Sequence, residues 1–375
     1  MRDGVVWNLV QLLTANSSAA VIADDLWPSI LEQALHHGVA PLLYLRTREI
    51  PMPATAREHL KALYKSNLVR NHALAGEMNH LLALLREAGL PALELKGPAL
   101  AQRLYCDFAA RQIADLDILI RPGQFAAADE LLHRTGFHRD ARESRRTLQN
   151  LRDVLYRKSS EQGDIYLDLH FRLRPYGKRD ALVEQVWHEG AHGSAETLLL
   201  QLCLNIITHR FARLQPWMDL IALLQAESSS LDWSAVVRRA QELEWPAGVY
   251  WCLRRANELS EAGLAPAFAL QALAPGAASQ VTFLRLTGGD APTFLRRMPA
   301  LDGPRGTLAA FLCESGARRR LRLAAAIVFP PAATLRQMDV PLRRSSVPVH
   351  YASRLVRKCV QMARPARDGQ RSRAA

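Results

Sequence analysis

The chain has 375 residues, of which 49% are hydrophobic and 22% charged, as in a soluble globular protein with a sizeable core and two or three domains. Its formal charge of +12 is concentrated in residues 301–375, where 15 Lys and Arg stand against 4 Asp and Glu, a net of +11. The five cysteines are widely spaced and form no CxxC pair, which argues against a zinc site or a disulfide framework.

Targeting signals are not recognisable in the sequence. The first residues lack the apolar core and small-residue cleavage site of a signal peptide. The longest apolar stretch near the C-terminus, 323–335, contains two prolines and is too short to span a bilayer. Together with the cysteine pattern, these features predict a cytoplasmic protein without a transmembrane segment.

Residues 1–90 are predicted to form an N-terminal helical region. Apolar residues recur at helical spacing over 27–44 and again over the long run 54–88. Gly89 follows the second run as a plausible helix C-cap, and Pro91 lies just beyond it.

Residues 91–180 are predicted to form a small α/β core. After Gly89 the pattern changes to short apolar runs separated by Gly and Pro. The polar, Arg-rich stretch 138–162 predicts either a loop or a hairpin. The expected order is a strand at 92–96, a helix at 99–105, a strand at 113–120, a helix at 124–135 and a strand at 164–172.

Helices are predicted to dominate again after Ala195. Residues 181–310 are assigned to a helical domain and 311–375 to a basic C-terminal segment, whereas 263–310, rich in Ala, Gly and Pro, is expected to be less regular. The predicted helices are 197–209, 216–225, 233–243 and 248–262. The expected fold class is therefore α+β, with a small mixed sheet embedded between N-terminal and C-terminal helical regions.

Asp115 and Asp117 are the first candidate functional residues. Side chains alternate faces along a strand, so these two carboxylates point the same way while Leu116 and Ile118 point into a core. Adjacent carboxylates repel each other unless a cation lies between them, and Mg²⁺ (or Mn²⁺) is commonly held by one or two carboxylates plus substrate phosphates. The alternative is a solvated strand edge, because Asp-x-Asp is frequent by chance.

Asp168 supplies a third acid from the strand 164–172. The alternation there is strict, with Asp168 and His170 on the face opposite Leu167 and Leu169. Asp168 could complete the metal site and act on the attacking hydroxyl, or it could form a structural ion pair with Arg172 or Arg111. His170 could tune a proton or contact a phosphate, although a lone strand histidine is more often structural.

Lys96, Gly97 and Arg111 are the candidate nucleotide-binding residues. Backbone N–H groups at a tight Gly turn before a helix can contact phosphates, and the two cations could neutralise a triphosphate. The alternatives are a Lys96 that extends from a strand end to solvent, a Gly97 that serves only turn geometry, and a structural Arg111. His209 and Asp219 could line an acceptor pocket, but an internal hydrogen bond is the simpler interpretation.

Several blocks of the chain resemble the uncharacterised bacterial nucleotidyltransferase family of the polymerase-β-like superfamily. The most specific lie within residues 92–173, and weaker similarity lies in 37–43, in 217–224 and at Phe329-Pro330. The specific blocks are LKGPAL at 95–100, RQIADLDILIRP at 111–122, LLHRTGF at 131–137 and LDLHFRL at 167–173. The resemblance implies a nucleotidyltransferase fold, with Asp115 and Asp117 as metal ligands and Asp168 as the third carboxylate.

Two features depart from the broader superfamily pattern. Pro98 stands where a second Gly or Ser usually follows the first Gly of the turn, and it offers neither a hydroxyl nor an N–H group. The gap of sixteen residues between Pro98 and Asp115 is also longer than usual. Both departures concern the phosphate contacts more than the metal ligands.

The leading functional hypothesis is a metal-dependent enzyme that transfers a nucleoside monophosphate from an NTP to an unidentified acceptor and releases pyrophosphate. One alternative is a catalytically silent relative that binds a nucleotide or a partner through the same cleft. Another is a nucleic-acid-associated protein that uses the basic C-terminal segment. It is not favoured, because no RNP, zinc-finger or interleaved aromatic pattern accompanies the charge.

Overall fold

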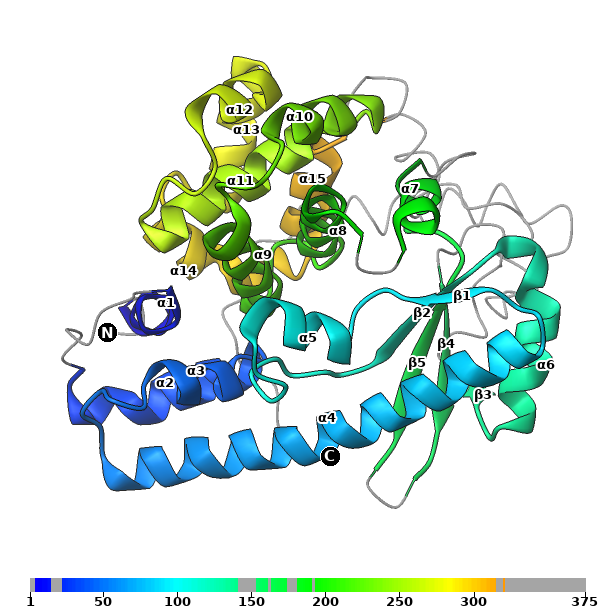
Figure 1. The fold of residues 1–375 in the computed structure, drawn as a ribbon. Helices are drawn as coiled ribbons and strands as arrows, with labels where there is room; N and C mark the ends of the chain where they lie inside the picture. Colours follow the sequence, from blue (N-terminus) through cyan, green and yellow to red (C-terminus); the bar gives the residue numbers. More distant parts are fainter. Residues whose placement is uncertain are drawn as a thin grey trace, which may run out of the picture.

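The protein combines helices with a five-stranded mixed sheet in the part of the chain that the structure describes (Figure 1). The structure is a computed structural model. It describes residues 4–14, 22–140, 153–160, 163–173, 181–190, 193–314 and residue 320. The predicted α+β class is confirmed. The basic C-terminal segment 311–375 and the Phe329-Pro330 block lie almost entirely outside the described residues.

The N-terminal region is helical, as predicted. A 3₁₀ turn at Asp24–Leu26 leads into the second of its helices. The helices are α1 (Val5–Thr14), α2 (Trp27–His36), α3 (Ala40–Arg46) and α4 (Ala54–Glu87). Helix α4 confirms the long predicted run and ends just before Gly89, whose φ of 70° closes the helix in the left-handed region.

The helical spacing predicted over 27–44 covers two helices rather than one, because the chain breaks between α2 and α3. Gly38 has a φ of 72°, and a Cβ atom there would lie 2.8 Å from Gln215 Oε1. Only glycine suits such a position. The apolar spacing continues through the break because both helices bury the same side, so Ile30 of α2 and Leu43 of α3 belong to one hydrophobic cluster.

The sheet has the strand order β1-β2-β5-β4-β3. Strands β2 and β5 run parallel, and the other neighbours are antiparallel. The strands are β1 (Ala92–Glu94), β2 (Leu116–Ile120), β3 (His138–Arg139), β4 (Asp153–Lys158) and β5 (Ile165–His170). The three predicted strands are present but shorter than predicted, and the 138–162 stretch contributes β3 and β4.

One face of the sheet is covered by α4 and by α6 (Phe125–Arg134), which follows a 3₁₀ turn at Pro122–Gln124 (Figure 1). The buried residues on this side come from strands and helices alike. They include Leu81, Leu85, Leu116, Ile118, Leu132, Leu167 and Leu169. Because strand side chains alternate, Asp117, Asp168 and His170 are left on the opposite face.

The helices after the sheet include all four that were predicted, together with α7 (Ala181–Glu189), which was not. They are α8 (Ala195–Thr208), α9 (Leu214–Glu227), α10 (Trp233–Glu242) and α11 (Pro246–Ser260). The expectation of irregular structure over 263–310 is wrong. Most of this stretch is helical: α12 (Ala267–Leu273), α13 (Ala277–Thr287), α14 (Ala291–Leu301) and α15 (Pro304–Leu312). Pro266 precedes α12 and Pro304 begins α15, positions where proline favours a helix start.

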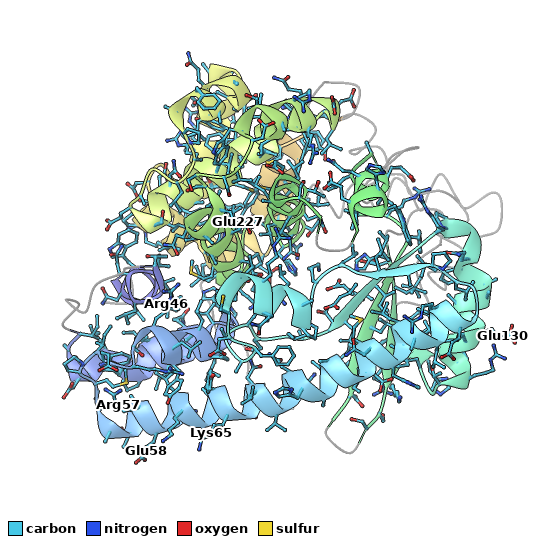
Figure 2. All side chains as sticks on the ribbon, in the orientation of Figure 1. Arg46, Arg57, Glu58, Lys65, Glu130 and Glu227 are labelled. Atoms are coloured by element: carbon cyan, nitrogen blue, oxygen red, sulfur yellow. The ribbon has the colours of Figure 1, made fainter. Side chains whose placement is uncertain are left out.

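A second hydrophobic cluster joins the N-terminal helices to the C-terminal ones. Leu9 of α1 and Ile30 of α2 share it with Trp217 of α9 and Trp251 of α11. Charged side chains such as Glu58, Lys65 and Glu130 project away from the ribbon (Figure 2). The division into four domains stays a prediction. None of the helices in the described ranges is long and apolar enough to cross a membrane.

Candidate metal centre

Asp117 and Asp168 lie side by side because the ladder between β2 and β5 pairs them directly. The two strands are parallel and in register, so both carboxylates leave the sheet at the same level and on the same face. Asp117 is only 2% exposed, and Asp168 is half-buried. The backbone thus holds together two like charges that the sequence placed on separate strands.

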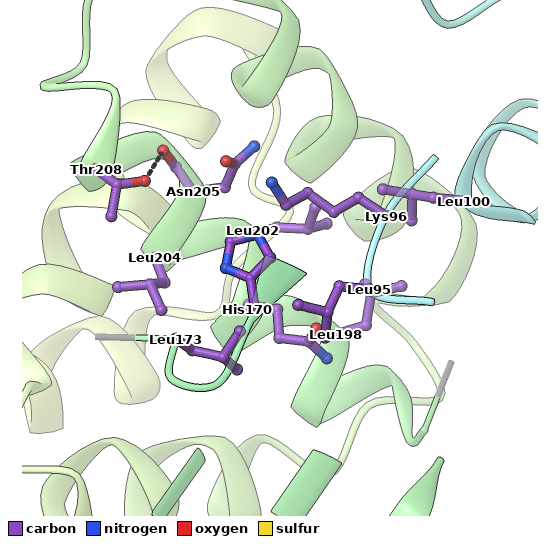
Figure 3. A pocket seen from close by; sticks show the side chains of 11 residues that line it. Leu95, Lys96, Leu100, His170, Leu173, Leu198, Leu202, Leu204, Asn205 and Thr208 are labelled. Atoms are coloured by element: carbon purple, nitrogen blue, oxygen red, sulfur yellow. Dashed lines mark hydrogen bonds between the residues drawn. The ribbon is translucent and has the colours of Figure 1, made fainter. Parts of the chain in front are cut away.

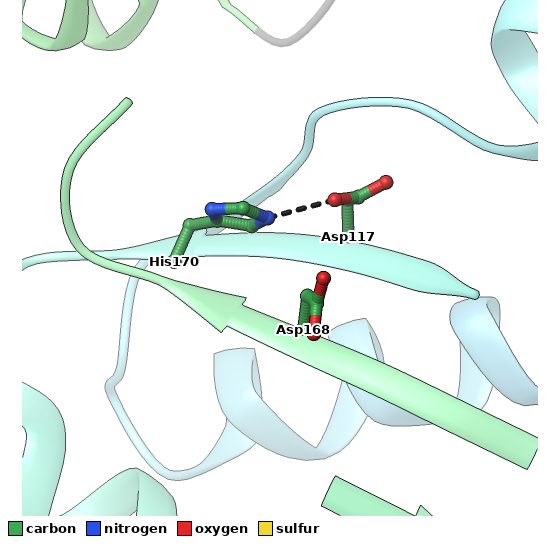
Figure 4. A group of neighbouring side chains, drawn as sticks. All are labelled: Asp117, Asp168 and His170. Carbon is green, nitrogen blue, oxygen red and sulfur yellow. Dashed lines mark hydrogen bonds and ion pairs between the residues drawn. The ribbon is translucent and has the colours of Figure 1, made fainter. Parts of the chain in front are cut away.

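Lys96 and His170 both contact Asp117. The Lys96 ammonium donates to Asp117 Oδ1 at 3.0 Å, and His170 Nε2 lies 2.7 Å from the same oxygen (Figure 4). Lys96 is positioned by the backbone, because the N–H of Leu95 donates to the Asp117 carbonyl at 3.0 Å. His170 follows Asp168 by two residues on β5 and therefore shares its face.

The pKa values of Asp117 and Asp168 are shifted in opposite directions. Burial raises the pKa of Asp168 to about 7, against the favourable charge of His170 and with the help of Asp117 and Asp115. Burial also opposes ionisation of Asp117, but Lys96 and His170 outweigh it and hold the pKa of Asp117 well below its ordinary range. Asp117 therefore stays ionised, whereas Asp168 can exchange a proton near neutral pH.

The donor set fits a divalent cation. Ligand atoms of Asp117, Asp168 and His170 all lie within 4.8 Å of one another. Carboxylate oxygens suit hard cations such as Mg²⁺ and Mn²⁺, and a cation between Asp117 and Asp168 would relieve the repulsion that raises the Asp168 pKa. These residues could hold one such ion.

Asp115 lies next to this group rather than in it. It precedes the first residue of β2 and has no partner in the β2–β5 register, and it is absent from the group of described metal-ligating side chains within 4.8 Å. Burial and the negative charge of Asp117 raise the pKa of Asp115, so Asp115 interacts electrostatically with the site. Its role as a ligand stays a prediction.

Gly97 forms the turn between β1 and α5 (Pro98–Tyr105), with a φ of 105°. A Cβ atom at this position would lie 3.2 Å from Glu94 Oε1, so glycine suits both the turn and its surroundings. The N–H of Ala99 donates to Glu94 Oε1 at 3.2 Å, which means that a protein carboxylate already occupies part of this helix start. Burial, with a contribution from Asp117, raises the pKa of Glu94. The nucleotide-binding role of Gly97 stays a prediction.

Arg111 makes a buried ion pair with Asp219 of α9, with Nε donating to Oδ2 at 3.0 Å. The Tyr105 hydroxyl donates to the other Asp219 oxygen at 2.8 Å. Asp219 is therefore the acceptor of internal hydrogen bonds, which was the simpler of its two predicted roles, and its partners are Arg111 and Tyr105. The sequence predicts that Arg111 contacts a triphosphate, and this stays a prediction. In the structure, Arg111 forms an ion pair with Asp219.

Two asparagines of α4 hold the loop that leads to the aspartates. Asn67 donates from Nδ2 to the carbonyls of Ala109 and Arg111, at 2.8 and 3.1 Å. Asn71, one helical turn further, donates to the carbonyls of Phe108 and Arg111, at 2.7 and 2.9 Å. Sequence analysis missed both residues, although two asparagines four apart inside a long helix are an unusual polar interruption of a buried face.

The predicted set also omitted His170 and Glu94, which lie near the site. The strict alternation on β5 already placed His170 beside Asp168, so a signal for it existed. Glu94 lies on β1 two residues before Lys96, and this spacing was the only sequence feature that indicated its proximity to the site. Asp153 of β4 also approaches, with Oδ2 3.7 Å from His170 Nδ1.

The raised pKa of Asp168 predicts how stability depends on pH without a divalent cation. The folded protein retains a proton that the unfolded chain releases between about pH 4 and about pH 7, so the free energy of unfolding falls as pH rises through that window. Replacing Asp168 with Asn should reduce this slope and stabilise the EDTA-treated protein above neutral pH. Urea unfolding at several pH values checks this, and an unchanged slope in Asp168→Asn would contradict it.

Comparison with known proteins gives one match. A family model described as uncharacterised nucleotidyltransferase matches residues 23–261, a range that runs from just before α2 to just past α11 and contains every residue of the site. Neither a curated protein nor a solved structure matches the chain.

Proposed function

The chain belongs to the uncharacterised nucleotidyltransferase family, and from this premise we propose that it transfers a nucleoside monophosphate from an NTP to an acceptor and releases pyrophosphate. The observation that carries the proposal is the direct pairing of Asp117 with Asp168 across parallel strands. A buried and a half-buried carboxylate, held side by side, suit both cation binding and proton transfer.

Asp117 and Asp168 would hold Mg²⁺ or Mn²⁺, with Asp115 as a further ligand. When bound, the cation would neutralise charge on the triphosphate and align the entering and leaving oxygens. His170 would orient the Asp117 carboxylate through its Nε2 contact, as an outer hydrogen-bond partner does in many metal sites. An imidazole nitrogen is a less usual ligand for Mg²⁺ than oxygen, which favours this role for His170.

Lys96 and Asp168 would complete the chemistry. The Lys96 side chain is 27% exposed, so its ammonium can reach a triphosphate placed beside Asp117. A carboxylate oxygen of Asp168 would accept the proton of the attacking hydroxyl, because it lies beside Asp117 at the level where the cation and the substrate would meet. Burial of the aspartates limits competition from bulk water.

The experiment is to incubate the full chain with each NTP, Mg²⁺ or Mn²⁺ and a fractionated metabolite extract, and to measure pyrophosphate. We expect release that requires the divalent cation and is lost on adding EDTA. Cation-dependent NTP binding without pyrophosphate from any fraction would favour the catalytically silent alternative. Neither binding nor release would contradict the proposal. The nucleic-acid alternative depends on residues 316–375, almost all of which lie outside the described residues.

A further inference from the structure

A small cavity lies where the ends of β1 and β5 meet α8 (Figure 3). Lys96 and His170, which both contact Asp117, line it, so the cavity is separated from Asp117 by these two side chains, and neither aspartate is among its described lining residues. Its volume is about 30 Å³. Because roughly 10–15 Å³ accommodates one water, the cavity has room for a group of about two non-hydrogen atoms.

Most of the cavity wall is aliphatic. The leucines that line it come from the segments after β1 and β5, from α5 and from α8: Leu95, Leu100, Leu173, Leu198, Leu202 and Leu204. No Phe, Tyr or Trp belongs to the described lining, so a nucleobase would find no stacking partner there.

The neutral polar residues of the wall lie along one stripe of α8. Gln201, Asn205 and Thr208 are spaced four and three residues apart, which places them on the same side of the helix. Gln201 Nε2 is buried and has no hydrogen-bond partner among the described residues. A buried N–H group without a partner is costly, so this donor is available to an acceptor oxygen of a group that enters the cavity.

The charges around the cavity restrict what can enter. Lys96 is the only Lys or Arg among its described lining residues, and in the proposed mechanism its ammonium is shared between Asp117 and the triphosphate. No carboxylate is among these lining residues to pair with an amine. A charged group would therefore lose its hydration without gaining a partner.

We propose that this cavity receives the attacking end of the acceptor, and that the acceptor is an uncharged primary alcohol whose –CH₂OH group fits between the leucines and Gln201. The inference rests on the proposed nucleotidyl transfer. The hydroxyl oxygen forms a bond to the α-phosphorus, the bond from that phosphorus to the bridging oxygen of pyrophosphate breaks, and the hydroxyl proton passes to Asp168. The products are an alkyl ester of the nucleoside monophosphate and pyrophosphate.

The test uses the full chain with the four NTPs, Mn²⁺ and defined alcohols, and mass spectrometry of the nucleotide products. Ethanol, ethylene glycol and glycerol represent neutral primary alcohols, glycolate and ethanolamine their charged counterparts, and tert-butanol a bulky one. We expect alkyl nucleotide esters from the neutral primary alcohols and at least about tenfold less from the others, comparable with the effect of one lost hydrogen bond to a charged or buried group.

Gln201→Met separates an acceptor role from a structural one, and Gln241→Met on the exposed face of α10 is the matched control. Gln201→Met should lower ester formation at least about tenfold, leave NTP binding unchanged and raise Tm, because it removes an unpaired buried amide. Gln241→Met should behave as wild type. Undiminished ester formation in Gln201→Met, equal use of charged alcohols, or a parallel loss of NTP affinity would each overturn the inference.

The same experiment distinguishes the two proposals. Release of free nucleoside monophosphate and pyrophosphate without alkyl ester, in the presence of every alcohol, would refute the acceptor inference and leave nucleotidyl transfer standing. No NTP binding and no pyrophosphate under any condition would refute the proposed function and the inference with it.

Discussion

Replacing Asp117 with Asn is expected to abolish divalent-cation-dependent NTP binding while the chain stays folded. Asn is close to Asp in shape but lacks the charge that attracts Lys96, His170 and a cation. Loss of an outer hydrogen-bond partner typically weakens metal binding about 10–100-fold, so loss of a direct carboxylate should exceed about 100-fold. Isothermal titration with NTP in the presence of Mg²⁺ measures the effect.

The matched control for this variant is Asp164→Asn, which makes the same change one residue before β5, at the end of the strand opposite His170. Asp164 pairs with Arg157 at the surface, where an ion pair contributes little. Asp164→Asn should bind NTP as the wild type does. His170→Ala should give the intermediate loss of about 10–100-fold expected of an orienting partner. Normal cation-dependent NTP binding by a folded Asp117→Asn protein would contradict the assignment of the site.

Asp219→Ala is expected to be the most destabilising single substitution near the site. Asp219 is fully buried, and its removal leaves the 8%-exposed Arg111 without its ion-pair partner and Tyr105 without its acceptor. Breaking a buried ion pair from one side typically costs about 3–5 kcal/mol. Chemical denaturation of the variant measures the loss.

Two further variants show whether the loss of stability in Asp219→Ala comes from leaving the Arg111 charge unpaired. In the double variant Arg111→Met with Asp219→Leu no charge is left unpaired, so most of the stability should return. Asp302→Ala breaks the exposed pair with Arg210, whose side chains are 43% and 56% exposed, and should cost less than about 1 kcal/mol. A double variant as unstable as Asp219→Ala would contradict the explanation.

Strands β1, β2 and β5, and the two faces of β5, were predictable because they depend on local periodicity. Strict alternation on β5 gave the correct burial for every residue from Ile165 to Leu169, and the long apolar repeat gave α4. The same alternation placed Asp168 and His170 on one face. Lys96 was expected near the aspartates, and it contacts Asp117.

The rest depends on contacts between distant segments. Arg111 and Asp219 are separated by 108 positions, and nothing in the local pattern of either one names the other. Asp115 was placed in a strand with Asp117, but β2 begins only at Leu116, where the ladder with β5 starts. The break at Gly38 and the helices after residue 263 were missed because apolar spacing alone does not distinguish a break, or a proline at a helix start, from continuous or irregular chain.

The central claim is that the nucleoside monophosphate, rather than the terminal phosphate, is transferred. Incubation of the full chain with Mg²⁺ and two preparations of the same NTP, one radiolabelled at the α-phosphate and one at the γ-phosphate, tests it directly. We predict that the α label appears in the acceptor product and the γ label appears in pyrophosphate. Transfer of the γ label to the acceptor, or release of the γ label as inorganic phosphate with the α label left in nucleoside diphosphate, would contradict it.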